Sequence, residues 1–204
     1  MTTIPVFNRM LSASQIEEAA IQLMGIWMPT YLRAVEQQLG LETNSTPHPE
    51  FISNRNSFDY IPGEKYPKLV AISPGLAGGP VADGAGQYRA AWRLGVGAVL
   101  AAKDEALANL QVKTYGTAIR QLFIDKQSLG GIAQAIRWED EEYPDLPIAN
   151  QNMLFKAAAV YFTVDCNNVA TKWSGPDIPD DDPYVYGQVE HVVIELEKIP
   201  VEEV

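Results

Sequence analysis

Cysteine, histidine and basic residues are scarce in this sequence, and each shortage argues against a class of function. The 204 residues include one cysteine, Cys166, and two histidines, His48 and His191. A single cysteine forms no intrachain disulfide, and two histidines are too few for a three-histidine zinc site. Lysine and arginine number 15 against 26 aspartates and glutamates, so the formal charge is −11 at pH 7. Because this charge repels phosphate, tight nucleic-acid binding is disfavoured.

The sequence also lacks a long hydrophobic run. Apolar windows such as residues 94–102 are much shorter than the roughly 20 residues of a membrane-spanning helix. Residues 1–10 lack the basic start and apolar stretch of a secretory signal. We therefore expect no membrane segment and synthesis in the cytoplasm. With 47% apolar and 20% charged residues, the composition is globular, and we expect residues 1–204 to form a single domain.

Residues 12–40 are expected to form an N-terminal helix. Ser12 with Gln15, and Ser14 with Glu17, have the spacing of a capping box, and Gly40 is a stop signal. Apolar residues recur at intervals of three and four, which places them on one helix face. The expected buried residues are Ile16, Ala20, Leu23, Trp27, Tyr31 and Val35.

Residues 41–67 follow as a long, polar, proline-containing extended arm. A segment of this length without periodicity is usually functional or disordered. We expect this arm either to dock on a partner or to wrap over the core.

Residues 68–200 are predicted to form a sheet-and-helix core of the α+β class. The expected sheet is mixed and mainly antiparallel, with about four to five strands flanked by helices. Strands are expected at residues 69–72, 88–100, 132–138, 155–166 and 185–199, and a helix at 104–126. The run 155–166 is apolar on both faces, which is typical of a central strand, whereas 185–199 has the half-solvated pattern of a sheet edge.

Two segments between these elements are expected to be irregular. The glycine-rich residues 73–86 are predicted to form a flexible hairpin loop, and residues 139–147 an acidic, proline-containing break. In the strand at 88–100, Gly95 and Gly97 lie on one face and leave room for another backbone or a helix to approach closely.

No catalytic apparatus is recognisable. Residues 73–86 lack the Gly-Lys-Ser/Thr ending of a nucleotide loop and the Gly-x-Gly-x-x-Gly of a dinucleotide fold. Cys166 lies in an apolar strand pattern that is more typical of a small buried hydrophobe than of a nucleophile activated by His191. Acidic runs at 139–142 and 180–182 offer oxygen ligands for a hard cation but lack calcium-hand spacing. We predict a protein without catalytic, metal or cofactor residues. The alternative from another class is a small hydrolase that uses Ser73 and the 73–86 loop.

Several segments, taken in order, resemble the tail terminator (tail completion) proteins of long-tailed bacteriophages. They are YPKLVAISPG at 66–75, YRAAW at 88–92, YGTAIR at 115–120, SLGG at 128–131, RWEDEEY at 137–143 and residues 189–200. The resemblance spans residues 66–200 and leaves the arm unmatched. It implies a cofactor-free homo-oligomeric ring, commonly a hexamer, at the head-proximal end of the virion tail.

The same resemblance implies the partners. They are other copies of the chain, the tail tube protein and a head-completion or connector protein, while DNA passes through the ring without specific binding. Another head-tail joining protein of the same particle is the alternative within this class. Strands with a partly apolar outer face suit subunits that pair into a closed ring, and an excess of carboxylates suits a channel that DNA crosses.

Contacts with subunits or partners are expected at exposed or half-apolar positions. These are Arg89, Arg93, Glu139, Asp140, Glu141, Glu142, His191 and Glu195.

Overall fold

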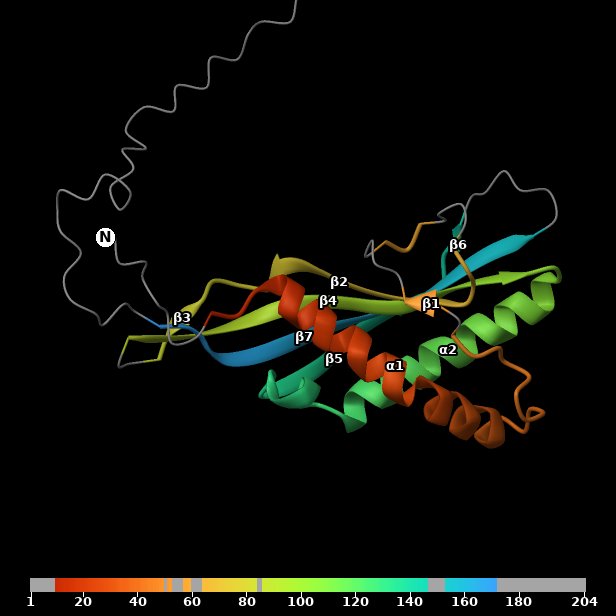
Figure 1. Cartoon of the computed structure of the whole chain (residues 1–204), viewed down its shortest axis with the longest axis horizontal. Helices are drawn as coiled ribbons and strands as arrows, with labels where there is room; N and C mark the ends of the chain where they lie inside the picture. The colour runs from red at the N-terminus through yellow and green to blue at the C-terminus, as the bar shows by residue number, and fades with distance from the viewer. Residues whose placement is uncertain are drawn as a thin grey trace, which may run out of the picture. The chain divides into compact units, whose positions relative to one another are not determined.

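Two α-helices lie on one face of a mixed sheet in the described part of the chain (Figure 1). The computed structural model describes residues 10–49, 51–52, 57–59, 64–83, 86–146 and 153–171. The main path through the sheet runs β1-β2-β4-β7-β5, with β3 paired to β4 and β6 to β7. The strands are β1 Phe51–Ile52, β2 Lys68–Leu76, β3 Val81–Ala82, β4 Gln87–Ala102, β5 Ala135–Glu142, β6 Asp145–Leu146 and β7 Leu154–Thr171.

This arrangement confirms the predicted α+β class with a mixed, mainly antiparallel sheet. Only the short pairing of β1 with β2 is parallel among the described strands. β4 and β7 pair along almost their whole lengths, from Gln87 opposite Thr171 to Ala102 opposite Leu154. β7 also pairs with β5, so the predicted central strand at 155–166 is confirmed. The predicted strand at 185–199 lies outside the described residues.

Helix α1 spans Ala13–Gln38 and begins with the predicted capping box. The Ser12 backbone N–H donates to Gln15 Oε1 at 2.9 Å, and the Gln15 N–H donates to Ser12 Oγ at 3.4 Å. The helix ends just before Gly40, whose φ of +67° is the left-handed conformation that glycine adopts readily.

The buried face of α1 matches the expected one at both ends of the helix and differs in its middle. Ile16, Ala20 and Val35 are buried as expected, whereas Met24, Met28 and Leu32 form the fully buried stripe between them and Trp27 is 37% exposed. Its indole ring instead lies under the Lys126 ammonium that follows the second helix, 4.2 Å from the ring centroid. A partly exposed aromatic ring is stabilised by such a cation, which places Trp27 at the border of the helix interface rather than inside it.

Helix α2 spans Glu105–Asp125, as predicted for residues 104–126. The Asp104 side chain accepts a hydrogen bond from the Leu107 N–H at 2.8 Å and caps the helix. The Phe123 ring stacks on Phe162 of β7, with centroids 5.0 Å apart, so α2 covers the middle of the sheet. The apolar residues that recur along the helix at intervals of three and four are all buried: Ala108, Val112, Tyr115, Ile119, Leu122 and Phe123.

Two segments expected to be irregular are strands. β2 continues to Leu76 with a register shift after Ile72, and β3 pairs Val81 with Arg89, so much of the 73–86 loop belongs to the sheet. The acidic residues 139–142 are not a break but the second half of β5, which pairs with β7. In both cases a long neighbouring strand supplies the hydrogen-bonding partners, and this outweighs the low strand propensity of glycine and carboxylate residues.

A second, smaller apolar cluster occupies the sheet face opposite the helices. Val70, Val99 and Ala157 form its buried centre, and Phe58 and Tyr66 of the arm pack against it. An ideal Cβ at position 97, where the chain has glycine, would clash with the Ala158 backbone carbonyl of β7, so the predicted close approach of another backbone is confirmed. The same Cβ would lie only 2.5 Å from the Phe58 ring, so a ring of the arm, and not a helix, also packs beside this glycine. The described parts of the arm therefore wrap over one end of this face.

No helix in the described ranges is long and apolar enough to cross a membrane.

Candidate subunit interface

The start of the arm is fixed to the helices by a buried carboxylate. Glu36 is 2% exposed and accepts hydrogen bonds from Thr46 N (2.6 Å), Asn44 N (2.9 Å) and Ser45 Oγ (3.2 Å). Burial alone would raise the pKa of Glu36. These hydrogen bonds favour the ionised carboxylate and hold the pKa below its ordinary value. The Tyr115 hydroxyl also donates to the Pro47 carbonyl at 2.7 Å. These hydrogen bonds fix the position of residues 44–47, where the arm leaves the helices.

The end of the arm is fixed to the opposite sheet face by a buried cation. Lys68 of β2 is fully buried, and its Nζ contacts Glu64 Oε2 at 2.8 Å and the Asp59 carbonyl at 2.7 Å. The ammonium also lies 5.8 Å from the Tyr66 ring centroid. Because a buried ammonium needs such partners, this end of the face is closed by the arm.

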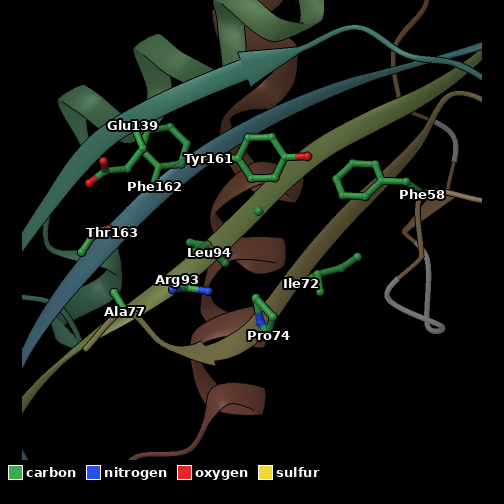
Figure 2. Close-up of a pocket in the computed structure, with 11 residues that line it drawn as sticks. Phe58, Ile72, Pro74, Ala77, Arg93, Leu94, Glu139, Tyr161, Phe162 and Thr163 are labelled. Atoms are coloured by element: carbon green, nitrogen blue, oxygen red, sulfur yellow. The ribbon is translucent and has the colours of Figure 1, made fainter. Parts of the chain in front are cut away.

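Beyond Phe58 the same face carries a hollow of about 580 Å³ (Figure 2). Its walls are mainly apolar and include Phe58, Ile72, Pro74, Ala77 and the Tyr161 ring. We refer to this cavity as the hollow. Three of the long strands, β2, β4 and β7, form its floor, and an ideal Cβ at the glycine of position 95 would touch the Tyr161 ring at 3.4 Å, so the glycine leaves space for that ring.

Two opposite charges stand at the hollow without partners in the described ranges. Arg93 comes from β4 and Glu139 from β5, and both are exposed (Figure 2). Neither side chain forms an ion pair or hydrogen bond with any described residue. The Arg93 backbone carbonyl accepts a hydrogen bond from Ser73 Oγ at 2.7 Å. An apolar depression with exposed charged residues at its edge is typical of the centre and rim of a protein interface.

The acidic residues of β5 divide between the two faces of the sheet. Glu141 faces the helices, where its carboxylate contacts Arg120 Nη1 at 2.6 Å and accepts a hydrogen bond from the Tyr143 hydroxyl at 3.1 Å. Burial and this carboxylate raise the pKa of Tyr143 to about 12, although Arg120 acts in the opposite direction. Glu142 accepts a hydrogen bond from the Tyr161 hydroxyl at 3.3 Å. Glu141 is therefore engaged within its own chain.

One end of the sheet extends past the helices toward β3 (Figure 1). We call this end the sheet tip and define it by Leu76, Val81, Asp83, Tyr88 and Arg89. Leu76, Val81 and Tyr88 are 37%, 49% and 40% exposed, although each belongs to a strand. The side chains of Asp83 and Arg89 are exposed and have no ion-pair partner in the described residues. The sheet tip thus presents apolar and charged groups together.

The expected contact residues fall into three groups. Arg93 and Glu139 lie at the hollow and Arg89 lies at the sheet tip, whereas Asp140, Glu141 and Glu142 follow along β5. His191 and Glu195 lie outside the described residues. Sequence reasoning missed the apolar walls of the hollow, especially Phe58, Ile72 and Tyr161. The glycines at 95 and 97 were the only local signal of space on this face.

The residues considered as candidate catalytic or metal-binding groups make contacts within the fold. The Ser73 hydroxyl donates to a backbone carbonyl, and the Ser73 N–H donates to Glu17 Oε1 at 2.6 Å. Cys166 is 1% exposed within the main core, and His48 Nε2 lies 3.2 Å from Asn44 Oδ1. Within the described ranges, no three His, Cys, Asp or Glu residues are grouped so that they could hold a metal ion.

Comparisons with known proteins do not assign the chain to a family: no family model matches it, and no curated protein matches it significantly.

Proposed function

We propose that this protein is a structural subunit that assembles with its own copies into a ring, and that the ring is the tail terminator of a long-tailed bacteriophage. The observation that carries the proposal is the sheet face opposite the helices. The described arm covers only one end of it, and the remainder holds an apolar hollow lined also by Arg93 and Glu139, whose side chains have no ion-pair or hydrogen-bond partner among the described residues. Burial of such apolar surface by another molecule is favourable.

The arrangement of layers also supports assembly through this face. The helices bury the first face of the sheet in the main core, whereas in the described residues the hollow on the second face and the sheet tip keep apolar groups exposed. The residues that line the hollow come from strands and from the anchored arm. Because binding groups held on rigid elements lose little entropy on association, this surface is suited to a permanent structural contact.

Assembly can be tested directly on the purified full-length chain. Size-exclusion chromatography with light scattering, over a concentration series, is expected to reveal one defined oligomer, and electron microscopy is expected to reveal closed rings. A protein that stays monomeric at every concentration, both alone and with phage tails, would refute the proposal.

The terminator role needs a separate test. In a phage that encodes this chain, loss of the protein is expected to give tails of irregular length that do not join heads, and added purified protein is expected to cap tail tubes. Tails of normal length with unjoined heads would instead indicate another head-tail joining protein.

A further inference from the structure

We propose that Lys68 is a positioning residue for assembly: its buried ammonium fixes the bend at residues 57–59, so that the Phe58 ring forms the arm-side wall of the hollow that a second copy contacts. This inference rests on the proposed self-assembly and adds how its contact surface is shaped. The Lys68 side chain is fully buried, so it acts through Phe58 and does not itself touch the neighbouring copy.

The sheet register brings Lys68 and Phe58 to the same place. Lys68 pairs with Val99 of β4, and Val70, two residues further along β2, pairs with Gly97. Because side chains alternate along a strand, Lys68 and Val70 share one face of the sheet, which is the face opposite the helices. The Phe58 ring packs on this face at Gly97, where a Cβ would lie 2.5 Å from the ring. The glycine thus leaves the space that the ring occupies.

Hydrogen bonds on both sides of Phe58 hold the bend in place. The Ser57 hydroxyl donates to Asp59 Oδ2 at 2.7 Å and accepts from the Asp59 N–H at 3.0 Å. Lys68 Nζ donates to the Asp59 carbonyl at 2.7 Å and to Glu64 Oε2 at 2.8 Å. The two bonds with Ser57 are local and fix the shape of the bend, whereas the bond from Lys68 joins the bend to β2. A buried ammonium without these acceptors would be costly, so the acceptors and the cation hold one another.

The Phe58 ring belongs to two apolar surfaces at once. It packs against the small cluster centred on Val70, and it lines the hollow together with Ile72 and Tyr161 (Figure 2). Movement of the bend would therefore remove one wall of the hollow. Aromatic side chains in well-packed pockets are frequent energetic centres of protein interfaces, and a group that is fixed before binding loses little entropy when the contact forms. Fixing the bend thus favours assembly through the hollow.

Removing the ring or the ammonium tests this role in the full-length chain. Phe58→Ala deletes the wall, and Lys68→Met removes the ammonium but keeps an apolar side chain of similar length. Each variant is expected to raise the protein concentration for half-assembly about tenfold. Two control variants should assemble like the wild type: Lys65→Met removes an exposed lysine nearby, and Leu107→Ala shortens an apolar side chain that is 44% exposed on α2.

A double-mutant cycle separates positioning from a general loss of stability. If Lys68 acts by placing Phe58, the double variant Phe58→Ala/Lys68→Met should assemble no worse than the poorer single variant, because the position of the bend no longer matters once the ring is gone. Urea unfolding curves will identify a buffer in which every variant is folded. Glu64→Gln loosens the same anchor more mildly and replaces Lys68→Met if that variant does not fold.

Several results of this cycle would overturn the inference. Effects of the two substitutions that multiply, to about 100-fold in the double variant, would mean that Lys68 acts independently of Phe58. Normal assembly of Phe58→Ala would exclude the ring from the contact between copies. If that variant assembles normally but no longer binds phage tails, the hollow belongs to a contact with a different protein.

The position of the ring can also be measured without assembly. In nuclear magnetic resonance spectra recorded below the concentration for assembly, the Phe58 ring current shifts the resonances of the adjacent Gly97. Phe58→Ala and Lys68→Met should move these resonances in the same direction, and Lys65→Met should leave them in place. Gly97 resonances that stay unchanged in Lys68→Met would overturn this inference alone, whereas a wild-type chain that never assembles would overturn the proposed function as well.

Discussion

Replacing Glu36 with glutamine tests how the arm is held on the body of the protein. Glu36 Oε1 accepts hydrogen bonds from Thr46 N and Ser45 Oγ, and Oε2 accepts one from Asn44 N. Glutamine keeps one acceptor oxygen but turns an amide N–H₂ toward a donor, so at least one backbone N–H loses its partner. A hydrogen bond to a charged group contributes about 1.5–3 kcal/mol and an unsatisfied buried donor costs about 1–3 kcal/mol. We expect Glu36→Gln to lower the free energy of unfolding by about 2–3 kcal/mol.

The assay is urea unfolding followed by tryptophan fluorescence at one fixed protein concentration, because assembly shifts apparent stability. For a protein of this size the loss corresponds to a decrease in Tm of about 4–12 °C. Glu42→Gln is the matched control, since Glu42 is exposed in the same segment, and it should change the free energy of unfolding by about 0.5 kcal/mol or less.

The pH dependence of this difference provides a second check on Glu36. Its pKa in the folded protein lies below the ordinary value of 4.5. The stabilisation is therefore fully present above about pH 4.5 and is lost as the pH falls through the folded pKa. The gap between the wild type and Glu36→Gln should be largest near neutral pH and shrink on acidification. A variant as stable as the Glu42→Gln control, or a gap that widens in acid, would refute the reasoning.

Three further changes test the packing on both faces of the sheet. Gly97→Ala should lower the free energy of unfolding by about 1–3 kcal/mol or more, because its Cβ meets backbone and an aromatic ring, whereas Gly78→Ala, which meets nothing within 4 Å, should not. The pKa of Tyr143 is raised from 10.0 to about 12, so the contribution of this residue to stability is lost as the pH rises through that range. Tyr143→Phe should therefore lose less stability than the wild type between pH 10 and 12, as measured by urea midpoints on either side of that range. Lys68→Ala leaves the Glu64 carboxylate without its cation and should cost about 3–5 kcal/mol in the same assay, while Lys65→Ala at an exposed position should be nearly neutral.

Long periodic segments were predictable because their local signals agree with their tertiary surroundings. Helix α2 carries its apolar residues at helical spacing and a capping aspartate at Asp104, so sequence and structure coincide. The two-sided apolar pattern of β7 likewise identified the central strand of the sheet. In each case the residues that define the element also form its core contacts.

The errors arose where a distant segment decides the outcome. On α1, two overlapping sets of apolar residues recur at the same helical spacing, so spacing alone does not show which set is buried. Nor does the sequence indicate that the Trp27 ring lies under Lys126, which follows the other helix. Residues 139–142 are charged and poor strand formers, yet they pair with β7, and one of them, Glu141, meets Arg120 on α2. Local propensity is overridden when a long partner strand is already in place.

The candidate interface was only partly predictable for the same reason. Charged residues such as Arg93 and Glu139 can be nominated from the sequence because they occupy positions expected to be exposed. The hollow between them depends on Phe58 of the arm and Tyr161 of β7, which are about a hundred residues apart in the chain and meet only through the sheet. No local sequence pattern indicates that these two side chains line the same hollow.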